Sequence, residues 1–290
     1  MAAANMKAVK LRIKSVQNTM QITKAMQLVA ASKLRKAKER ADRCKPYLST
    51  LWQTLTEIAN DNTDFQSPYT RATNSDKWLY IVIAGDRGLA GGYNSNLFKY
   101  MESERKGKTI EVLPLGKKAV EYFRYKDDVV TFTDEYSEVA KVTLSDCFTV
   151  AKSVCEAYKK GEFGHILLCY TDFISMLSQV PQALPLLPLS DLTGEMEHIS
   201  DGKPRELILY EPDSETVFNT IVPEYLAGLL YTSINISVAS ELAARRTAME
   251  AATDNAEEMI GKLNLFYNRA RQSSITQEIT EIVAGSEGSR

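Results

Sequence analysis

A glycine-rich turn is the first place in this sequence where ligand chemistry could occur. Residues 85–94 read GDRGLAGGYN and directly follow the apolar run 77–84, KWLYIVIA. Parallel α/β proteins hold nucleotide phosphates at such a turn after a strand. The spacing, however, is neither G-x-G-x-x-G nor a P-loop ending in Lys and Ser or Thr. The turn is therefore interpreted as a tight strand-to-helix connection that needs glycine backbone freedom, with a nucleotide-dependent enzyme as the less favoured alternative.

The second candidate is a basic segment near the N-terminus. Its cations are Lys7, Lys10, Arg12, Lys14, Lys24, Lys33, Arg35, Lys36, Lys38, Arg40, Arg43 and Lys45. Only Glu39 and Asp42 oppose them. Three interpretations remain open: a solvated helix face, which charge alone favours, a nucleic-acid patch, and a match to an acidic protein partner. Aromatic residues are missing from 6 to 46, which argues against single-strand nucleic-acid binding.

The histidines, cysteines and paired acidic residues are not spaced in the sequence as in known catalytic or metal-binding motifs. The histidines, His165 and His198, are far apart in sequence and have no triad-like context. The cysteines, Cys44, Cys147, Cys155 and Cys169, contain no Cys-x-x-Cys pair, so buried, reduced thiols are expected. The acidic pairs at 127–128 and 257–258 are interpreted as solvated surface. We expect no catalytic residue, no metal site and no cofactor in this chain.

Composition sets wide limits on the fold. The 290 residues are 44% hydrophobic and 25% charged, with a net charge of -2, which suits one large or two small globular domains. No apolar run approaches the roughly 20 residues of a membrane span. The N-terminus has no apolar signal region, and residues 286–290 are expected to form a flexible tail.

A helix is predicted from about residue 6 to 58. Steps of four and three give the stripe Val9, Ile13, Val16, Met20, Thr23, Gln27, Ala30, Leu34, Ala37, Ala41, Cys44, Leu48, Leu51, Leu55 and Ile58. Only Thr23 and Gln27 are polar, so this is a heptad seam. Pro46 should bend the helix, and residues 60–62, Asn-Asp-Asn, should end it.

A second long helix is predicted from about Pro223 to 283, with Gly285 as its stop. Its stripe is Val238, Leu242, Arg245, Met249, Ala252, Ala256, Met259, Leu263, Phe266, Ala270 and Ser273. At 1.5 Å per residue the two helices would span roughly 80 and 90 Å, more than a domain's width, so their stripes should bury each other as an antiparallel two-helix coiled coil. Polar Thr23, Gln27, Arg245 and Ser273 should fix the register.

The middle region, 75–212, alternates between strands and helices. Strands are predicted at 77–84, 109–113, 129–133, 165–171 and 206–210, and helices at 95–105, 117–125 and 144–159. This alternation predicts a Rossmann-like α/β domain with a largely parallel sheet. Residues 181–204, which contain four prolines, are interpreted as loop. The expected domains are 1–62, 75–212 and 220–285.

Three segments resemble a known family. Residues 15–26, SVQNTMQITKAM, with 29–34, VAASKL, are similar to the N-terminal signature of gamma subunits of bacterial F-type ATP synthases. Residues 248–256, AMEAATDNA, and 267–282, YNRARQSSITQEITEI, resemble the C-terminal signature, and 86–94 fit the middle turn. The resemblance covers nearly the whole chain.

The resemblance implies a rotating central shaft with no catalysis of its own. The implied partners are the hexamer of alpha and beta subunits, the epsilon subunit and the c ring, at the cytoplasmic face of the bacterial membrane. The residues matching the beta-subunit contacts are Lys24, Met26, Lys33, Arg35, Lys36, Arg271, Gln272 and Thr276. Tyr210 and Glu211 match the c-ring contact. A coiled-coil scaffold or nucleic-acid-binding protein is the alternative.

Overall fold

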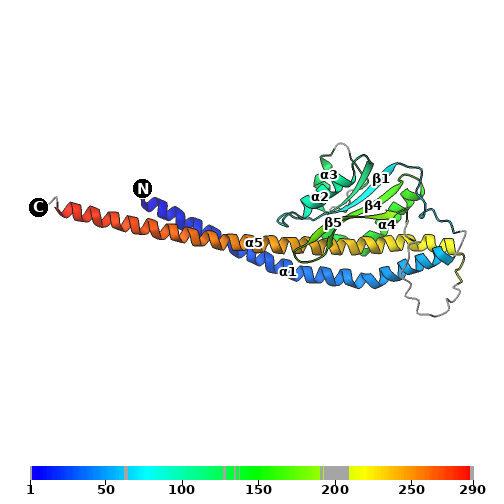
Figure 1. Ribbon diagram of the computed structural model, residues 1–290, viewed down its shortest axis with the longest axis horizontal. Coiled ribbons are helices and arrows are strands. Elements are labelled where there is room, and N and C mark those ends of the chain that lie inside the picture. The colour runs from blue at the N-terminus through cyan, green and yellow to red at the C-terminus, as the bar shows by residue number, and fades with distance from the viewer. Residues whose placement is uncertain are drawn as a thin grey trace. The chain divides into compact units, whose positions relative to one another are not determined.

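The structure, a computed structural model, describes residues 2–61, 65–126, 129–133, 135–136, 138–189, 192 and 209–287 (Figure 1). The chain divides into two compact units. Unit 1 contains Met1–Ser32 and Arg245–Arg290, and unit 2 contains Lys33–Ala244. The predicted acidic pair at 127–128 and the tail residues 288–290 lie outside the described residues.

The first long helix, α1, runs over Ala2–Asp61 and ends where predicted. Every member of its four-three stripe is buried or half-buried, which confirms the predicted heptad pattern from Val9 to Ile58. Pro46 lies inside α1, and the helix continues through it. The pyrrolidine ring removes one backbone donor, but the flanking turns bury apolar side chains that hold the helix together.

The second long helix, α5, runs over Ser214–Glu287 and corrects both predicted ends. It begins before Pro223 because Asp213 caps it: Asp213 Oδ1 accepts the Thr216 N–H at 2.8 Å, and Oδ2 accepts the Thr216 hydroxyl at 2.8 Å. Pro223 therefore lies within the helix. The helix also passes Gly285, since a lone glycine weakens a helix without ending it.

In unit 1, α1 and α5 meet through a pair of threonines. The hydroxyls of Thr23 and Thr253 lie 2.7 Å apart, which gives Thr23 a polar partner on the other helix at a position where the sequence predicts a register-fixing group. Beyond Met249 the predicted seam of α5 is confirmed at Ala252, Ala256, Leu263 and Ala270, which are buried or half-buried, and wrong at Met259, Phe266 and Ser273, which are exposed. The other half-buried positions of this stretch, which the prediction missed, are Thr253, Ile260, Tyr267 and Ser274.

In unit 2, α1 and α5 pack closely and run antiparallel. Trp52 and Tyr225 have ring centroids 5.4 Å apart, and a Cβ on Gly228 would lie 3.0 Å from Leu48 Cδ2. Glycine at 228 therefore allows the close approach. One stretch of α5 reaches the hydropathy of a membrane span, contrary to the sequence estimate, but 78% of it is buried within the protein, as in a core helix.

The sheet of unit 2 has the order β3-β2-β1-β4-β5. The strands are β1 (Lys77–Ile83), β2 (Thr109–Leu115), β3 (Val130–Thr131), β4 (His165–Phe173) and β5 (Gln179–Leu187). The pairs β1·β2, β1·β4 and β2·β3 are parallel, which confirms a largely parallel sheet, and β5 joins β4 antiparallel.

Strand β5 corrects the loop predicted from residue 181. It contains Pro181 and Pro185, which lack a backbone N–H, but it lies at the sheet edge, where one side needs no donor. Of the strand predicted at 206–210, residues 206–208 lie outside the described residues, and Leu209 and Tyr210 are not in a strand.

Helices cover both faces of this sheet (Figure 1). One face packs against α2 (Tyr93–Glu104) and α3 (Lys117–Arg124). The other packs against α4 (Leu144–Lys159) and α5, with Leu55 and Ile58 of α1 in the same core. The alternation of β1 is visible here, since Leu79 and Ile81 face the second layer and Tyr80 and Val82 the first.

Candidate functional site

The glycine-rich turn lies where a ligand would bind in an open parallel sheet. The strand order reverses between β1 and β4, and ligands bind at the carboxyl ends of strands at such a switch point. Here the protein's own carboxylate takes the backbone donors. Asp86 Oδ1 accepts N–H groups from Lys117 at 3.2 Å and Val139 at 2.9 Å, and Oδ2 accepts that of Ala140 at 3.1 Å.

Side chains from α5 pack against this turn and the neighbouring strand. Ser237, fully buried, lies 2.9 Å from the Tyr93 hydroxyl and accepts the Thr171 N–H at 3.2 Å. Glu241, only 7% exposed, packs on Gly85, where a Cβ would come within 2.9 Å of the Glu241 Cδ. The turn is thus packed against α5 through Gly85 and bonded through Asp86 to the start of α3 and to residues 139–140.

The cysteines are unreactive at neutral pH where they are buried. All are free, and Cys147, Cys155 and Cys169 are buried. Burial raises the pKa of Cys147 and Cys169 to about 12 and that of Cys155 to about 11, so the thiolates do not form. Within the described residues, His, Cys, Asp and Glu side chains do not gather into a group of three that could hold a metal ion.

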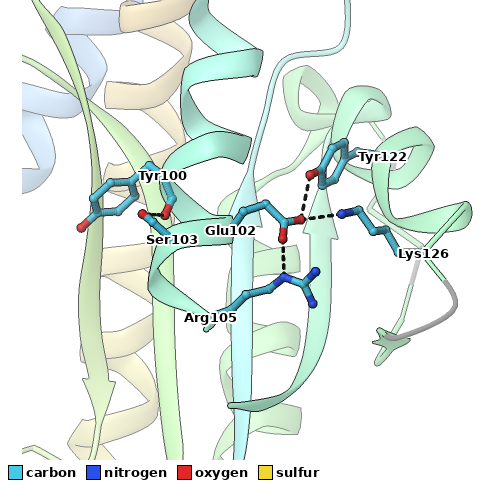
Figure 2. Close-up of polar contacts among 6 residues, drawn as sticks. All are labelled: Tyr100, Glu102, Ser103, Arg105, Tyr122 and Lys126. Atoms are coloured by element: carbon cyan, nitrogen blue, oxygen red, sulfur yellow. Dashed lines mark hydrogen bonds and ion pairs between the residues drawn. The ribbon is translucent and has the colours of Figure 1, made fainter. Parts of the chain in front are cut away.

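One polar cluster was not found by sequence reasoning (Figure 2). Glu102 of α2 accepts hydrogen bonds from Arg105 Nε at 2.6 Å and from the Tyr122 hydroxyl and Lys126 Nζ, both at 2.7 Å. Tyr122 also stacks on Phe98 with centroids 4.1 Å apart. A shallow hollow of about 480 Å³ adjoins this cluster. With its oxygens held by three donors, Glu102 ties α2 to α3 and is not available as a base.

The charge of Glu102 should make unit 2 sensitive to acid. Burial opposes its ionisation, but the bonds from Lys126, Tyr122 and Arg105 outweigh it and lower the pKa to about 2. Because the pKa of Glu102 is lower in the folded protein than its ordinary value of 4.5, the ionised carboxylate stabilises the fold at pH values above 4.5. This contribution is lost as the pH falls toward 2. We expect Glu102→Gln to lower the free energy of unfolding by about 1–3 kcal/mol at pH 7 and by less at pH 3.

Urea unfolding at both pH values measures this difference. Glu258→Gln is the matched control, because Glu258 pairs with Lys262 in an exposed i,i+4 bridge. Solvent screens such exposed pairs, so they contribute little to stability. If Glu102→Gln lowers the free energy of unfolding equally at pH 7 and pH 3, the stabilising role of the ionised Glu102 carboxylate is contradicted.

The basic segment of α1 is accessible. Lys24, Lys33, Arg35 and Lys36 are exposed and Met26 is half-buried. Lys24 and Met26 belong to unit 1, and the other three to unit 2. Arg35 makes a weak exposed pair with Glu39 at 3.8 Å, which leaves most of the positive charge available to a partner.

The other predicted contact residues lie on or before α5. Arg271, Gln272 and Thr276 are exposed on α5, and the Thr276 hydroxyl donates to the Gln272 carbonyl at 2.9 Å. Tyr210 is half-buried and packs against the core of unit 2, while Glu211 is exposed. The structure thus places two sets of exposed polar side chains on the long helices and a smaller set just before α5.

Comparisons with known proteins agree with this architecture. A family model described as ATP synthase matches residues 5–288. The ATP synthase gamma chain of Ruminococcus albus is 47% identical over 289 residues, covering 98% of each chain, and that of Lachnoclostridium phytofermentans is 41% identical, covering 97% of this chain and 98% of its own.

Solved structures share the fold at lower identity. The rotor of the Euglena gracilis mitochondrial ATP synthase aligns with a TM-score of 0.63 at 20% identity, covering 94% of this chain and 99% of its own. The central stalk and c-ring structure from Tetrahymena thermophila aligns with a TM-score of 0.55 at 23% identity, covering 80% and 99%. With relatives above 40% identity along nearly its full length, the chain belongs to the ATP synthase gamma chain family.

Proposed function

We propose that this chain is the central rotor shaft of an F-type ATP synthase. It couples ion translocation through the membrane c ring to ATP synthesis or hydrolysis in the beta subunits, and so regulates ATPase activity and ion flow. The observation that carries the proposal is the similarity to gamma chains over 98% of the chain, together with the two long helices α1 and α5, which pack on each other. A stiff element that contacts several sites differently can bias each of them in turn.

The proposed rotor is not itself catalytic. Its glycine turn is filled by Asp86 and by side chains of α5, and its buried thiols stay protonated. ATP chemistry is assigned to the beta subunits. Residues 1–62 and 220–285 form the proposed shaft and 75–212 the foot. The complex is placed peripherally at the cytoplasmic face of the bacterial cell membrane.

Contacts are assigned by position in the family signatures. The beta-subunit contacts are Lys24, Met26, Lys33, Arg35, Lys36, Arg271, Gln272 and Thr276. Exposed cations suit acidic loops of beta, and exposed Arg271 can hold a carboxylate with two hydrogen bonds. Tyr210 and Glu211, which directly precede α5, are assigned to the c ring, and the foot domain to epsilon.

Reconstitution tests the proposal. Alpha and beta subunits mixed with this chain should sustain ATP hydrolysis, and the mixture without it should not. Equal turnover in both mixtures would overturn the rotor assignment. Nucleic-acid binding that falls steeply with salt, in a chain that does not join the hexamer, would favour the scaffold alternative.

Met26→Lys tests the proposed beta contact. Met26 is half-buried on α1 between basic residues, so a lysine there adds positive charge toward an acidic loop. We expect stronger attraction between rotor and beta, with ATP synthesis reduced more than ATP hydrolysis. Membrane vesicles assayed for both activities measure the ratio. Met26→Leu keeps the volume without charge and should retain coupling, whereas unchanged synthesis in Met26→Lys would remove the contact from the proposal.

A further inference from the structure

The hollow beside the Glu102 cluster has features that the structural role of the cluster does not use (Figure 2). It has a volume of about 480 Å³ and lies where α2 and α3 meet in unit 2. The rings of Phe98 on α2 and Tyr122 on α3 give it apolar walls, and Lys99 and Lys106 line it as well. The hollow therefore combines apolar surface with positive charge, which is the composition of a site that docks a partner's side chains.

The two lysines carry positive charge that is open to a partner. Both are exposed, and among the residues that the structure describes neither forms an ion pair or a hydrogen bond. Glu102, the acid of the hollow, is already bonded to Arg105 and Lys126, so it has two cations of its own. Carboxylates of a partner can therefore pair with Lys99 and Lys106 without displacing a contact.

The other described acids of α2 and α3 do not offset this charge. Glu121 of α3 pairs with Lys118 at 2.6 Å. Glu104 lies two positions after Glu102 on α2, which places it on the opposite side of the helix, near Tyr80 of β1. The described walls of the hollow thus keep an excess of positive charge.

The aromatic walls suit an aliphatic or phenyl side chain better than a stacked nucleobase. Phe98 is only 9% exposed, and its ring stacks on that of Tyr122 with centroids 4.1 Å apart. Lys126 Nζ lies 5.0 Å from the centroid of the Tyr122 ring, and the Tyr122 hydroxyl is bonded to Glu102. Little ring face is left on which a base could stack, and two free lysines are few for a phosphate backbone. These contacts favour a polypeptide as the occupant.

The spacing of the lysines specifies the segment that fits. Lys99 and Lys106 are seven positions apart, which is about 10 Å along a helix. In an extended chain, every second side chain points to the same side, and residues four apart are about 13 Å apart. Lysine side chains are long enough to cover the difference. A segment with carboxylates at its first and fifth positions and an apolar side chain at its third matches both lysines and the apolar walls.

We propose that this hollow docks an extended, acidic polypeptide segment of that pattern on a partner protein. The central apolar side chain packs against Phe98 and Tyr122, and the two carboxylates face Lys99 and Lys106. The inference needs only the fold of unit 2 and not the proposed rotor function. Its failure therefore leaves the rotor assignment standing, and failure of the reconstitution experiment leaves this docking site standing.

A charge-swap experiment with the full chain tests the site. The probe is the peptide Glu-Ser-Phe-Ser-Glu, acetylated and amidated so that its termini carry no charge, titrated at low salt and followed by saturation-transfer NMR. We expect a dissociation constant below about 1 mM, with the phenyl protons receiving most of the saturation. Lys99→Glu with Lys106→Glu should weaken binding about tenfold or more and should bind Lys-Ser-Phe-Ser-Lys instead.

A control with the same change of charge tells the site from bulk electrostatics. Lys152→Glu with Lys160→Glu changes two exposed lysines at α4, on the other side of the sheet, and should keep binding of the acidic peptide within about twofold. Equal losses in the two double variants overturn the docking site, and so does unchanged binding after the change at 99 and 106. A thymidine octanucleotide that binds the parent chain more tightly than the peptide, and displaces it, also overturns the site.

Filling the hollow gives an independent readout that leaves the charge unchanged. Ser103 lines the hollow, is exposed, and makes only a local bond to the Tyr100 carbonyl. Ser103→Trp should weaken binding of the acidic peptide about tenfold, because the indole takes the place of the phenyl group. Ser153→Trp, at an exposed position of α4, should leave binding unchanged. Full affinity in Ser103→Trp, in a chain whose urea unfolding midpoint matches that of the parent, overturns the proposal.

Discussion

Gly116→Ala is expected to unfold unit 2 or to lower its free energy of unfolding by about 3 kcal/mol or more. Gly116 has a φ of 97°, and a Cβ there would lie 2.2 Å from the carbonyl oxygen of Ala84. Neither atom can move easily, because the Ala84 N–H is bonded to Leu115 and the Gly116 N–H to Tyr136. The substitution therefore meets both a backbone conformation that disfavours side chains and a direct clash with a strand end.

Gly107→Ala separates these two effects. Gly107 also has a positive φ, 76°, but a Cβ there would meet nothing within 4 Å. Its cost should be only the conformational one, about 1 kcal/mol. Tryptophan fluorescence during denaturant unfolding is the measurement, because the two tryptophans, Trp52 and Trp78, both belong to unit 2. Equal costs for the two variants would show that the approach of Gly116 to Ala84 relaxes.

Ser237→Ala is expected to lower the free energy of unfolding of unit 2 by about 2–4 kcal/mol. One hydroxyl serves two buried groups, the Tyr93 hydroxyl and the Thr171 N–H, which come from α2 and β4. Removing it leaves both without this partner in a dry interior, where an unmade hydrogen bond costs more than a made one contributes. Amide hydrogen exchange at Thr171 should accelerate as the fixed attachment of α5 is lost.

Ser240→Ala is the matched control on the same helix. Ser240 is also fully buried, but within the described residues its hydroxyl has no hydrogen-bond partner. Its removal should change the free energy of unfolding by less than about 1 kcal/mol, because a buried unpaired hydroxyl contributes no bond to lose. The contrast between two serines three positions apart is the result to check, and equal losses would show that volume rather than hydrogen bonding governs this face of α5.

The sequence predicted the features that depend on periodicity. The stripe of α1 was found in full because fifteen positions repeat one spacing, and burial of such a stripe leaves little choice of face. The strand β1 was equally plain, since KWLYIVI is apolar and bounded by a glycine turn. The largely parallel sheet followed from alternation of strands and helices.

Features that depend on a partner element were missed. In α5, Ala252 and Thr253 are both half-buried, and the hydrogen bond between Thr253 and Thr23 on the other helix could not be seen in the apolar pattern. Pro223 looked like a helix start because the cap at Asp213 gives no apolar signal. Strand β5 was taken for loop because its prolines are tolerated only at an edge, and edges are defined by the whole sheet.

The candidate functional residues also differ in whether the sequence alone could predict them. Lys24, Met26 and Arg271 were singled out through their place in family signatures, and the structure adds that the two charged ones are exposed. The bridge at Ser237 and the cluster at Glu102 each join residues far apart in sequence, so single-sequence reasoning had no pattern to detect.

The packing around the glycine-rich turn has a mechanical consequence. Asp86 in this turn accepts the backbone N–H groups of Lys117, Val139 and Ala140, and Glu241 of α5 packs on Gly85. The end of β1 is therefore held both by its neighbours in the α/β layer and by the long helix. A torque applied to the sheet is passed directly to α5, because no pliable linker separates the two.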